Sequence, residues 1–335
     1  MSMTLPPSPA PAAAPRRWRD LALLGGLMAL VVAGLIGLAA ATGWAETRAQ
    51  LLRLGPVQVA ALLGFSLVNY LMRGLRWHLF ARRIGLPPGL VRDMRHFLGG
   101  FLMSATPGRV GELVRIRWIR RETGVPLDRS APLFLVDRAA DLVAMALILA
   151  GALALSASGI AGALPLAGLA LGTAVVATRP RLLAGLVTLA YRALGCCPRL
   201  FVRARGMARA LRHFSHSGTL AAAVGLGVVG WMAEGVAFYM LLIWLGADIA
   251  LSTATAIFVF ATLAGGLTGA PGGLGGAEAA MIALLTLEGL PPETSIAATA
   301  VIRVTTLWFA IGLGAMVFPI AERMSKRTRH AMENR

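Results

Sequence analysis

Ala131–Leu155 reads APLFLVDRAADLVAMALILAGALAL, and this stretch decides the class of the protein. An α-helix rises about 1.5 Å per residue, so a helix of this length can cross a hydrocarbon core about 30 Å thick. Leu21–Ala41 is a second such block and contains no ionisable side chain. Of the 335 residues, 57% are hydrophobic and only 14% are charged, whereas an ordinary soluble domain has about 25% charged residues. The sequence therefore predicts an all-α integral membrane protein.

The net charge of +17 results from 32 Lys and Arg against 15 Asp and Glu. In a soluble chain this excess would suggest nucleic-acid binding, but membrane proteins concentrate Lys and Arg in their cytoplasmic loops. With a cytoplasmic N-terminus, nearly all basic residues fall on the inner side, and the outer loops hold Arg48 and Arg53. We therefore expect both termini in the cytoplasm of a bacterium, a location in its inner membrane, and no nucleic-acid partner.

Polar or basic loops separate six segments that we expect to be full transmembrane helices. These are Leu21–Ala41, Pro56–Met72, Ala131–Leu155, Ile160–Thr178, Leu220–Leu245 and Ser295–Ile320. The Pro-rich residues 1–20 are expected to be a disordered cytoplasmic N-terminus, residues 21–320 the membrane domain, and residues 321–335 a basic cytoplasmic tail. Arginines before Leu21 resemble the start of a signal peptide, but the apolar block is longer than a usual signal-peptide core, so we interpret it as a retained span.

Two further apolar segments are interrupted by Pro-Gly and predict re-entrant helical hairpins. His96–Thr106 is about half the length that a span needs, stops at Pro107-Gly108 and restarts as the more polar helix Arg109–Arg121. The second hairpin consists of Ala250–Gly269, the breaker Pro271-Gly272 and Gly275–Leu287. The two hairpins would enter from opposite faces, which is typical of inverted-topology repeats with a binding site at the midplane. The alternative is coincidence, since the chain contains 39 glycines.

Ionisable side chains inside the apolar segments mark the candidate site. Each costs roughly 2.5–3.5 kcal/mol on insertion and normally faces a partner or a wet cavity. Those that we expect to bind a lipid head group are Arg109, Glu112, Arg115, Glu234, Glu278 and Arg303. Those that we expect to form a supporting ion-pair network are Arg76, Asp137, Arg138 and Asp141. For the pairs Glu112–Arg115 and Arg138–Asp141, the alternative is that they only lock helices together.

The hairpin tips add features that suit an anion. A half-helix that begins in the membrane after Pro-Gly points its N–H groups and its positive dipole end inward, and arginine offers a fork that matches phosphate oxygens. The expected tip residues are Pro107, Gly108, Gly111, Pro271, Gly272, Gly273 and Gly275, where glycine permits close approach of the backbone. The carboxylates would balance charge, bind a cationic group or carry a proton.

Signatures of common enzymes and of metal sites are missing from the sequence. The five histidines are scattered without metal-ligand spacing, and the adjacent Cys196 and Cys197 cannot form a disulfide framework or a thiolate zinc site. The Gly-rich Pro271–Gly276 has no following Lys-Ser/Thr, so it is not a nucleotide-binding P-loop. We therefore expect no catalytic residues, no metal and no cofactor.

Six motifs occur in an order that resembles a known family. They are Arg73-Gly74-Leu75-Arg76-Trp77, Pro107-Gly108-Arg109-Val110-Gly111-Glu112 with Arg115, Asp137-Arg138-x-x-Asp141-Leu142, Trp231-x-x-Glu234, Pro271-Gly272-Gly273-Leu274-Gly275 with Glu278, and Arg303 with Trp308. Together they resemble the flippase-like transmembrane domain of lysylphosphatidylglycerol synthetases and its stand-alone bacterial relatives, over Leu21–Ile320. In the fused proteins of this family, the domain moves aminoacylated phosphatidylglycerol between leaflets, and a soluble aminoacyl-transferring domain follows it.

The resemblance implies a lipid translocator, with membrane lipids as its ligands. Only 15 residues follow Ile320 here, so we do not expect lysyl transfer; separate enzymes would synthesise the lipid. The chain is also similar to stand-alone members associated with hopanoid biosynthesis, so phospholipid, aminoacyl-phospholipid and hopanoid-type lipid all stay open. The alternatives are a membrane-embedded lipid-modifying enzyme or its subunit, and a secondary carrier for a small anion. The oligomeric state is not predicted.

Overall fold

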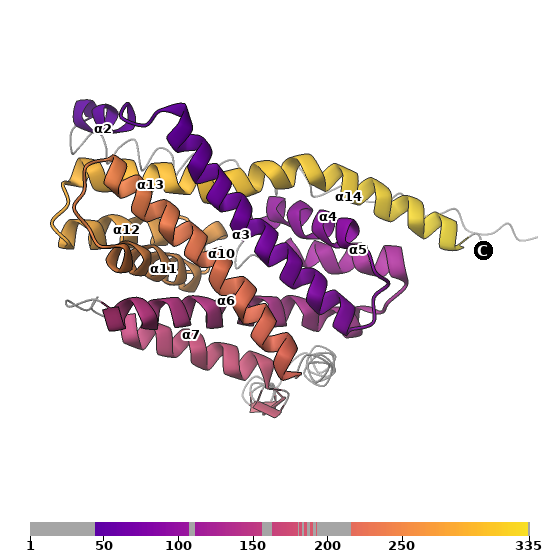
Figure 1. Ribbon diagram of the computed structural model, residues 1–335. Helices are drawn as coiled ribbons and strands as arrows, with labels where there is room; N and C mark the ends of the chain where they lie inside the picture. The colour runs from indigo at the N-terminus through magenta and orange to yellow at the C-terminus, as the bar shows by residue number, and fades with distance from the viewer. Residues whose placement is uncertain are drawn as a thin grey trace, which may run out of the picture.

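The computed structural model describes residues 44–106, 111–155, 163–179 and 216–333, with a few positions between 181 and 192. Within these residues every regular element is a helix (Figure 1). Three predictions concern residues outside this part of the chain: the disordered N-terminus at residues 1–20, the span Leu21–Ala41, and the tip residues Pro107, Gly108 and Arg109.

The helices follow one another along the chain with short connections. They are α2 (Trp44–Leu51), α3 (Pro56–Arg83), α4 (Leu90–Gly100), η1 (Phe101–Ala105), α5 (Val114–Thr123), α6 (Leu127–Leu155), α7 (Ala163–Thr178), α10 (Ser217–Trp244), α11 (Leu251–Leu267), η4 (Pro271–Gly273), α12 (Gly276–Leu287), α13 (Pro292–Arg303), η5 (Val304–Trp308) and α14 (Phe309–Glu333).

Three described helices are long and apolar enough to cross a membrane. They are α3, α10, and the continuous helix that runs from α13 through the π-helical η5 into α14. Helix α6 has 29 residues and carries the predicted charged group in its first half, while α7 and α11 have 16 and 17 residues. The protein is therefore an all-α integral membrane protein, as predicted, and the count of six complete spans stays a prediction.

Both predicted hairpins correspond to paired short helices. Helices α11 and α12 pack against each other and are joined through η4; α4 with η1 lies against α5 (Figure 1). The two tips meet, because η1 contacts η4. The second tip depends on glycine: Gly273 has a φ of 70°, and a Cβ there would lie 3.1 Å from the Gly265 carbonyl carbon. Only a residue without a side chain lets the chain turn back this close to α11.

Two of the predicted boundaries differ from the structure. The second span was predicted to end at Met72, but α3 continues to Arg83, so Arg73 and Arg76 lie inside the protein rather than in a basic loop. Carboxylates on α6 neutralise these two arginines and remove the penalty that would end an apolar segment. At the other end of the chain, α14 has no break at Ile320 and includes most of the predicted tail.

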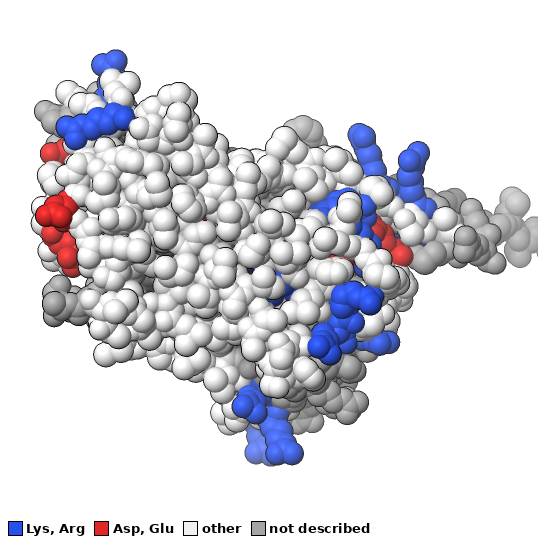
Figure 2. Space-filling model, viewed as in Figure 1, with Lys and Arg blue, Asp and Glu red and all other residues white. Residues whose placement is uncertain are grey.

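Charged side chains on the surface gather at the two ends of the bundle. Figure 2 shows most exposed Lys and Arg at the end that carries the C-terminal half of α14, and exposed Asp and Glu at the opposite end. Between them the visible surface is largely uncharged, and it includes exposed apolar side chains such as Leu155, Leu164 and Leu287. An uncharged belt between two charged ends is typical of a protein that spans a bilayer.

Candidate functional site

A buried ion-pair network joins α3 to α6. Arg76 donates from Nε and Nη2 to Asp137 Oδ1, at 2.9 and 2.7 Å, and from Nη2 to Asp141 Oδ1 at 2.8 Å. Arg73 lies nearly one turn earlier on α3 and donates to Asp141 Oδ2 at 2.9 Å. Trp231 of α10 also donates its indole N–H to Asp141, at 3.1 Å. The predicted pairing of Arg76 with the two aspartates is therefore present, and Arg73 and Trp231 extend it.

Arg138 carries the network on to the first hairpin. Its Nη2 lies 2.9 Å from Asp137, 3.5 Å from Asp141 and 3.5 Å from Glu112. Glu112 pairs with Arg115 at 3.1 Å and accepts a hydrogen bond from the Ser104 hydroxyl at 2.6 Å. The connected described residues thus comprise four guanidinium groups and three carboxylates. One positive charge is left over, which favours an anionic ligand.

Arg115 is held in place mainly by aromatic rings. The side chain is fully buried, and its guanidinium carbon lies 4.5 Å from the ring centre of Phe97, 5.4 Å from that of Trp77 and 5.6 Å from that of Phe101. Such contacts stabilise a desolvated guanidinium. The predicted role of Arg115 in direct head-group binding is therefore not favoured by its position, which suits fixing the first hairpin.

A second ion pair lies at the tip of the second hairpin. Arg303, the last residue of α13, donates from Nε to Glu278 Oε1 at 2.6 Å and from Nη2 to the Gly272 carbonyl at 3.0 Å. Gly272 has a φ of 63°, which few residues other than glycine adopt. The three residues were predicted separately for the head-group site and the tip, and the structure brings them together.

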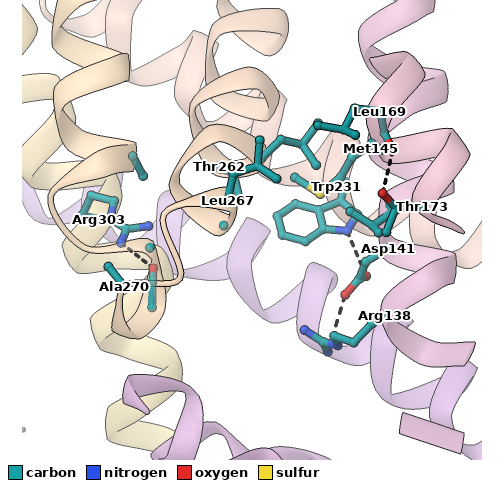
Figure 3. Close-up of a pocket in the computed structure, with 17 residues that line it drawn as sticks. Arg138, Asp141, Met145, Leu169, Thr173, Trp231, Thr262, Leu267, Ala270 and Arg303 are labelled. Atoms are coloured by element: carbon teal, nitrogen blue, oxygen red, sulfur yellow. Dashed lines mark hydrogen bonds and ion pairs between the residues drawn. The ribbon is translucent and has the colours of Figure 1, made fainter. Parts of the chain in front are cut away.

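A pocket of about 320 Å³ lies between these two clusters. In Figure 3, Arg138, Asp141 and Trp231 border one side, and Arg303 with the turn at Ala270 borders the other. The walls between them are mostly apolar, and they include Leu142, Met145, Leu169, Ala170, Leu263 and Leu267. Leu169 and Leu267, on α7 and α11, are 53% and 63% exposed, so apolar side chains also border the outer surface here.

A smaller cavity of about 50 Å³ adjoins this pocket and shares Trp231, Thr262 and Arg303 with it. Glu234, predicted for the head-group site, lines the smaller cavity together with Tyr70, Arg73 and Ser104. The predicted site residues therefore divide into three groups. Arg138, Asp141, Gly272, Gly273 and Arg303 line the pocket; Glu234 lines the adjoining cavity; and Glu112, Arg115, Asp137, Arg76 and Glu278 lie behind these surfaces.

The transmembrane region of lysylphosphatidylglycerol synthases matches residues 23–314, most of the chain and both clusters. The chain belongs to this family. Two UPF0104 membrane proteins of Methanothermobacter thermautotrophicus are also similar to it. One is 34% identical over 89 residues, 27% of this chain and 26% of the relative. The other is 29% identical over 112 residues, 33% of this chain and 34% of the relative. These matches thus span a third or less of the curated relatives, so the family assignment depends on the longer match.

A separate set of ion pairs fastens the first hairpin of this family member to α14. Glu322 accepts hydrogen bonds from the Trp118 indole N–H at 2.8 Å, from Arg117 at 2.9 Å and from Arg121 at 2.9 Å. Glu122 pairs with Arg95 of α4 at 2.8 Å. In the described part of the chain, no group of three or more His, Cys, Asp or Glu is placed to hold a metal ion.

Proposed function

We propose that this protein translocates a lipid with an anionic or zwitterionic head group between the leaflets of the membrane. The observation that carries the proposal is the pocket itself, in which Arg138 and Arg303 border opposite sides of an otherwise apolar space. Arginine matches the oxygens of a phosphate better than any other side chain, and the excess positive charge of the buried network favours a negative group.

The apolar walls support a lipid rather than a small soluble anion. Leu142, Met145 and Leu263 offer a surface for hydrocarbon, and the exposed Leu169 and Leu267 continue that surface to the outside of the bundle. A carrier for a small anion has no need of such a path. The candidate lipids are phospholipid, aminoacyl-phospholipid and hopanoid-type lipid.

We place the site near the midplane, between hairpins that enter from opposite faces as inverted repeats. The contact between η1 and η4 supports this arrangement. The basic end of the molecule would face the cytoplasm of a bacterial inner membrane, with both termini inside. The protein would not alter the lipid chemically and would receive it from separate lipid-synthesising enzymes.

Leaflet exchange in proteoliposomes tests the proposal. Phosphatidylglycerol with a fluorescent acyl chain is incorporated, and dithionite quenching reports how fast the inner-leaflet label reaches the outside. We expect exchange with the wild type, loss of exchange in Arg303→Ala, and normal exchange in Arg323→Ala, which removes an exposed arginine from α14. Equal exchange in protein-free liposomes and with the wild type would contradict the proposal.

Two further assays address the rival functions. Uptake of radiolabelled phosphate into the same vesicles would indicate a carrier for a small anion. A lipid of changed mass after incubation with the protein would indicate an enzyme. We expect neither signal above that of empty vesicles.

A further inference from the structure

We propose that Glu278 binds a proton when an anion occupies the pocket, so that an anionic head group and a proton are translocated together. The inference rests on the proposed function of the pocket and adds its coupling ion. It starts from the fact that one side chain, Arg303, belongs both to the pocket and to the ion pair with Glu278.

The geometry makes Glu278 and the ligand neighbours on the same guanidinium. Glu278 uses Arg303 Nε, at 2.6 Å, and the Gly272 carbonyl uses Nη2, at 3.0 Å. A guanidinium has five N–H donors, so Arg303 keeps donors for a ligand in the pocket. An anion that binds there would place two negative groups on a single cation.

Glu278 also has an oxygen that can receive a proton. The residue is only 4% exposed, and its Oε2 has no hydrogen-bond partner within the described residues. A proton on Oε2 leaves Oε1 free to keep its bond from Arg303. Proton uptake would therefore need no rearrangement of the ion pair.

The surroundings of Glu278 offer little other charge. Helix α12 packs against α11 and α13; α11 has no ionisable side chain, and α13 has only Glu293, at its opposite end, besides Arg303. Across the pocket are Arg138 and Asp141, which are tied into the network of α3 and α6. Arg303 is thus the counter-ion that Glu278 depends on within the described helices.

Binding of an anion then favours protonation for a simple electrostatic reason. Like charges near each other in a poorly solvated site favour the neutral form of one of them. Asp137 is less suited to this role, because it accepts from both Arg76 and Arg138. With Glu278 protonated, the pocket carries the same total charge after binding as before, which lowers the cost of moving the head group through the membrane.

Calorimetry of the purified full chain in detergent tests the inference. Soluble dihexanoyl phosphatidylglycerol is titrated at one pH in two buffers, PIPES and Tris, whose ionisation enthalpies differ, so the difference in heat gives the protons taken up per lipid bound. We expect about one proton in the wild type and an affinity that rises up to about tenfold per unit decrease in pH. In Glu278→Gln we expect binding without proton uptake and without this pH dependence.

The matched control is Glu288→Gln, the same substitution at the exposed C-terminal end of the same helix; it should keep the proton uptake. Saturable binding by the wild type without proton uptake, or unchanged uptake in Glu278→Gln, would overturn the inference and leave the proposed function standing. No lipid binding by the wild type would overturn both.

Discussion

Arg76 illustrates how this protein keeps a guanidinium inside an apolar bundle. The side chain is fully buried, and two aspartates of α6 accept its hydrogen bonds at 2.7–2.9 Å. A buried charge is tolerated only while its partners remain, because the loss of one partner leaves the other uncompensated. The network therefore serves two purposes: it stabilises the packing of α3 on α6, and it holds Arg138 at the edge of the pocket.

Asp137→Asn tests the structural role of the network. We expect the variant to lose about 3–5 kcal/mol of unfolding free energy, because Arg76 stays buried without its charge partner. Chemical denaturation in detergent micelles measures this. Asp248→Asn removes an exposed carboxylate and should change the value by less than about 0.5 kcal/mol. Equal stability of the two variants would show that the network contributes nothing to folding.

Much of the site could be predicted residue by residue from the sequence, since a charge in an apolar segment stands out. Glu278 and Arg303 were found in this way and lie in contact. Arg73 was left in a loop because the apolar pattern weakens after Met72, although its spacing of three residues from Arg76 places both on one helix face. The pairing of Arg73 with Asp141, 68 positions apart in the chain, depends on how α3 packs on α6, which one sequence does not reveal.

At the scale of elements, the second hairpin depends on its tip. Gly272, Gly273 and Gly275 all have positive φ values of 63–82°, and the turn brings the Gly272 carbonyl to Arg303. The Pro-Gly breakers predicted where the helices stop. They did not predict that the tips of the two hairpins touch, because that contact depends on the packing of α14 against α4, η1 and α5.

Gly273→Ala tests the tip. The left-handed conformation costs a residue with a side chain about 1–2 kcal/mol, and the added Cβ would press on Gly265. We expect lower thermal stability in detergent. Gly225→Ala, in the open face of α10, has no atom within 4 Å of the new Cβ and should not lower it, since alanine favours helix. A melting temperature of Gly273→Ala equal to that of the wild type would contradict the role assigned to this turn.

Glu322→Gln tests the attachment of the first hairpin to α14. The substitution removes the charge that Arg117 and Arg121 share, so α5 should open more often. Hydrogen–deuterium exchange should therefore become faster in residues 114–123 and stay unchanged in α12. Unchanged exchange in α5 would mean that apolar packing alone holds the hairpin.

At the scale of the whole molecule, composition alone predicted an all-α membrane protein, because 57% hydrophobic residues in long blocks leave few other classes. The orientation follows from the uneven charge seen in Figure 2. The number of spans is harder to predict, since α6, α7, α11 and α12 are either charged or short, and their depth depends on their neighbours.

Cysteine accessibility in intact and permeabilised cells tests the orientation. In a background with Cys196 and Cys197 replaced by serine, we introduce Arg120→Cys at the basic end and Leu287→Cys at the other; both native side chains are exposed. A membrane-impermeant maleimide should label position 287 in intact cells and position 120 only after permeabilisation. Labelling of both positions in intact cells would contradict the opposed hairpins.

The central claim is that the pocket between Arg138 and Arg303 holds a lipid by its head group. Native mass spectrometry of the protein purified in a mild detergent tests this directly. We expect the wild type and Arg323→Ala to retain an anionic or zwitterionic lipid in near-stoichiometric amount, and Arg303→Ala to lose it. Retention of the same lipid at the same level by all three proteins, or the absence of lipid from the wild type, would contradict the claim.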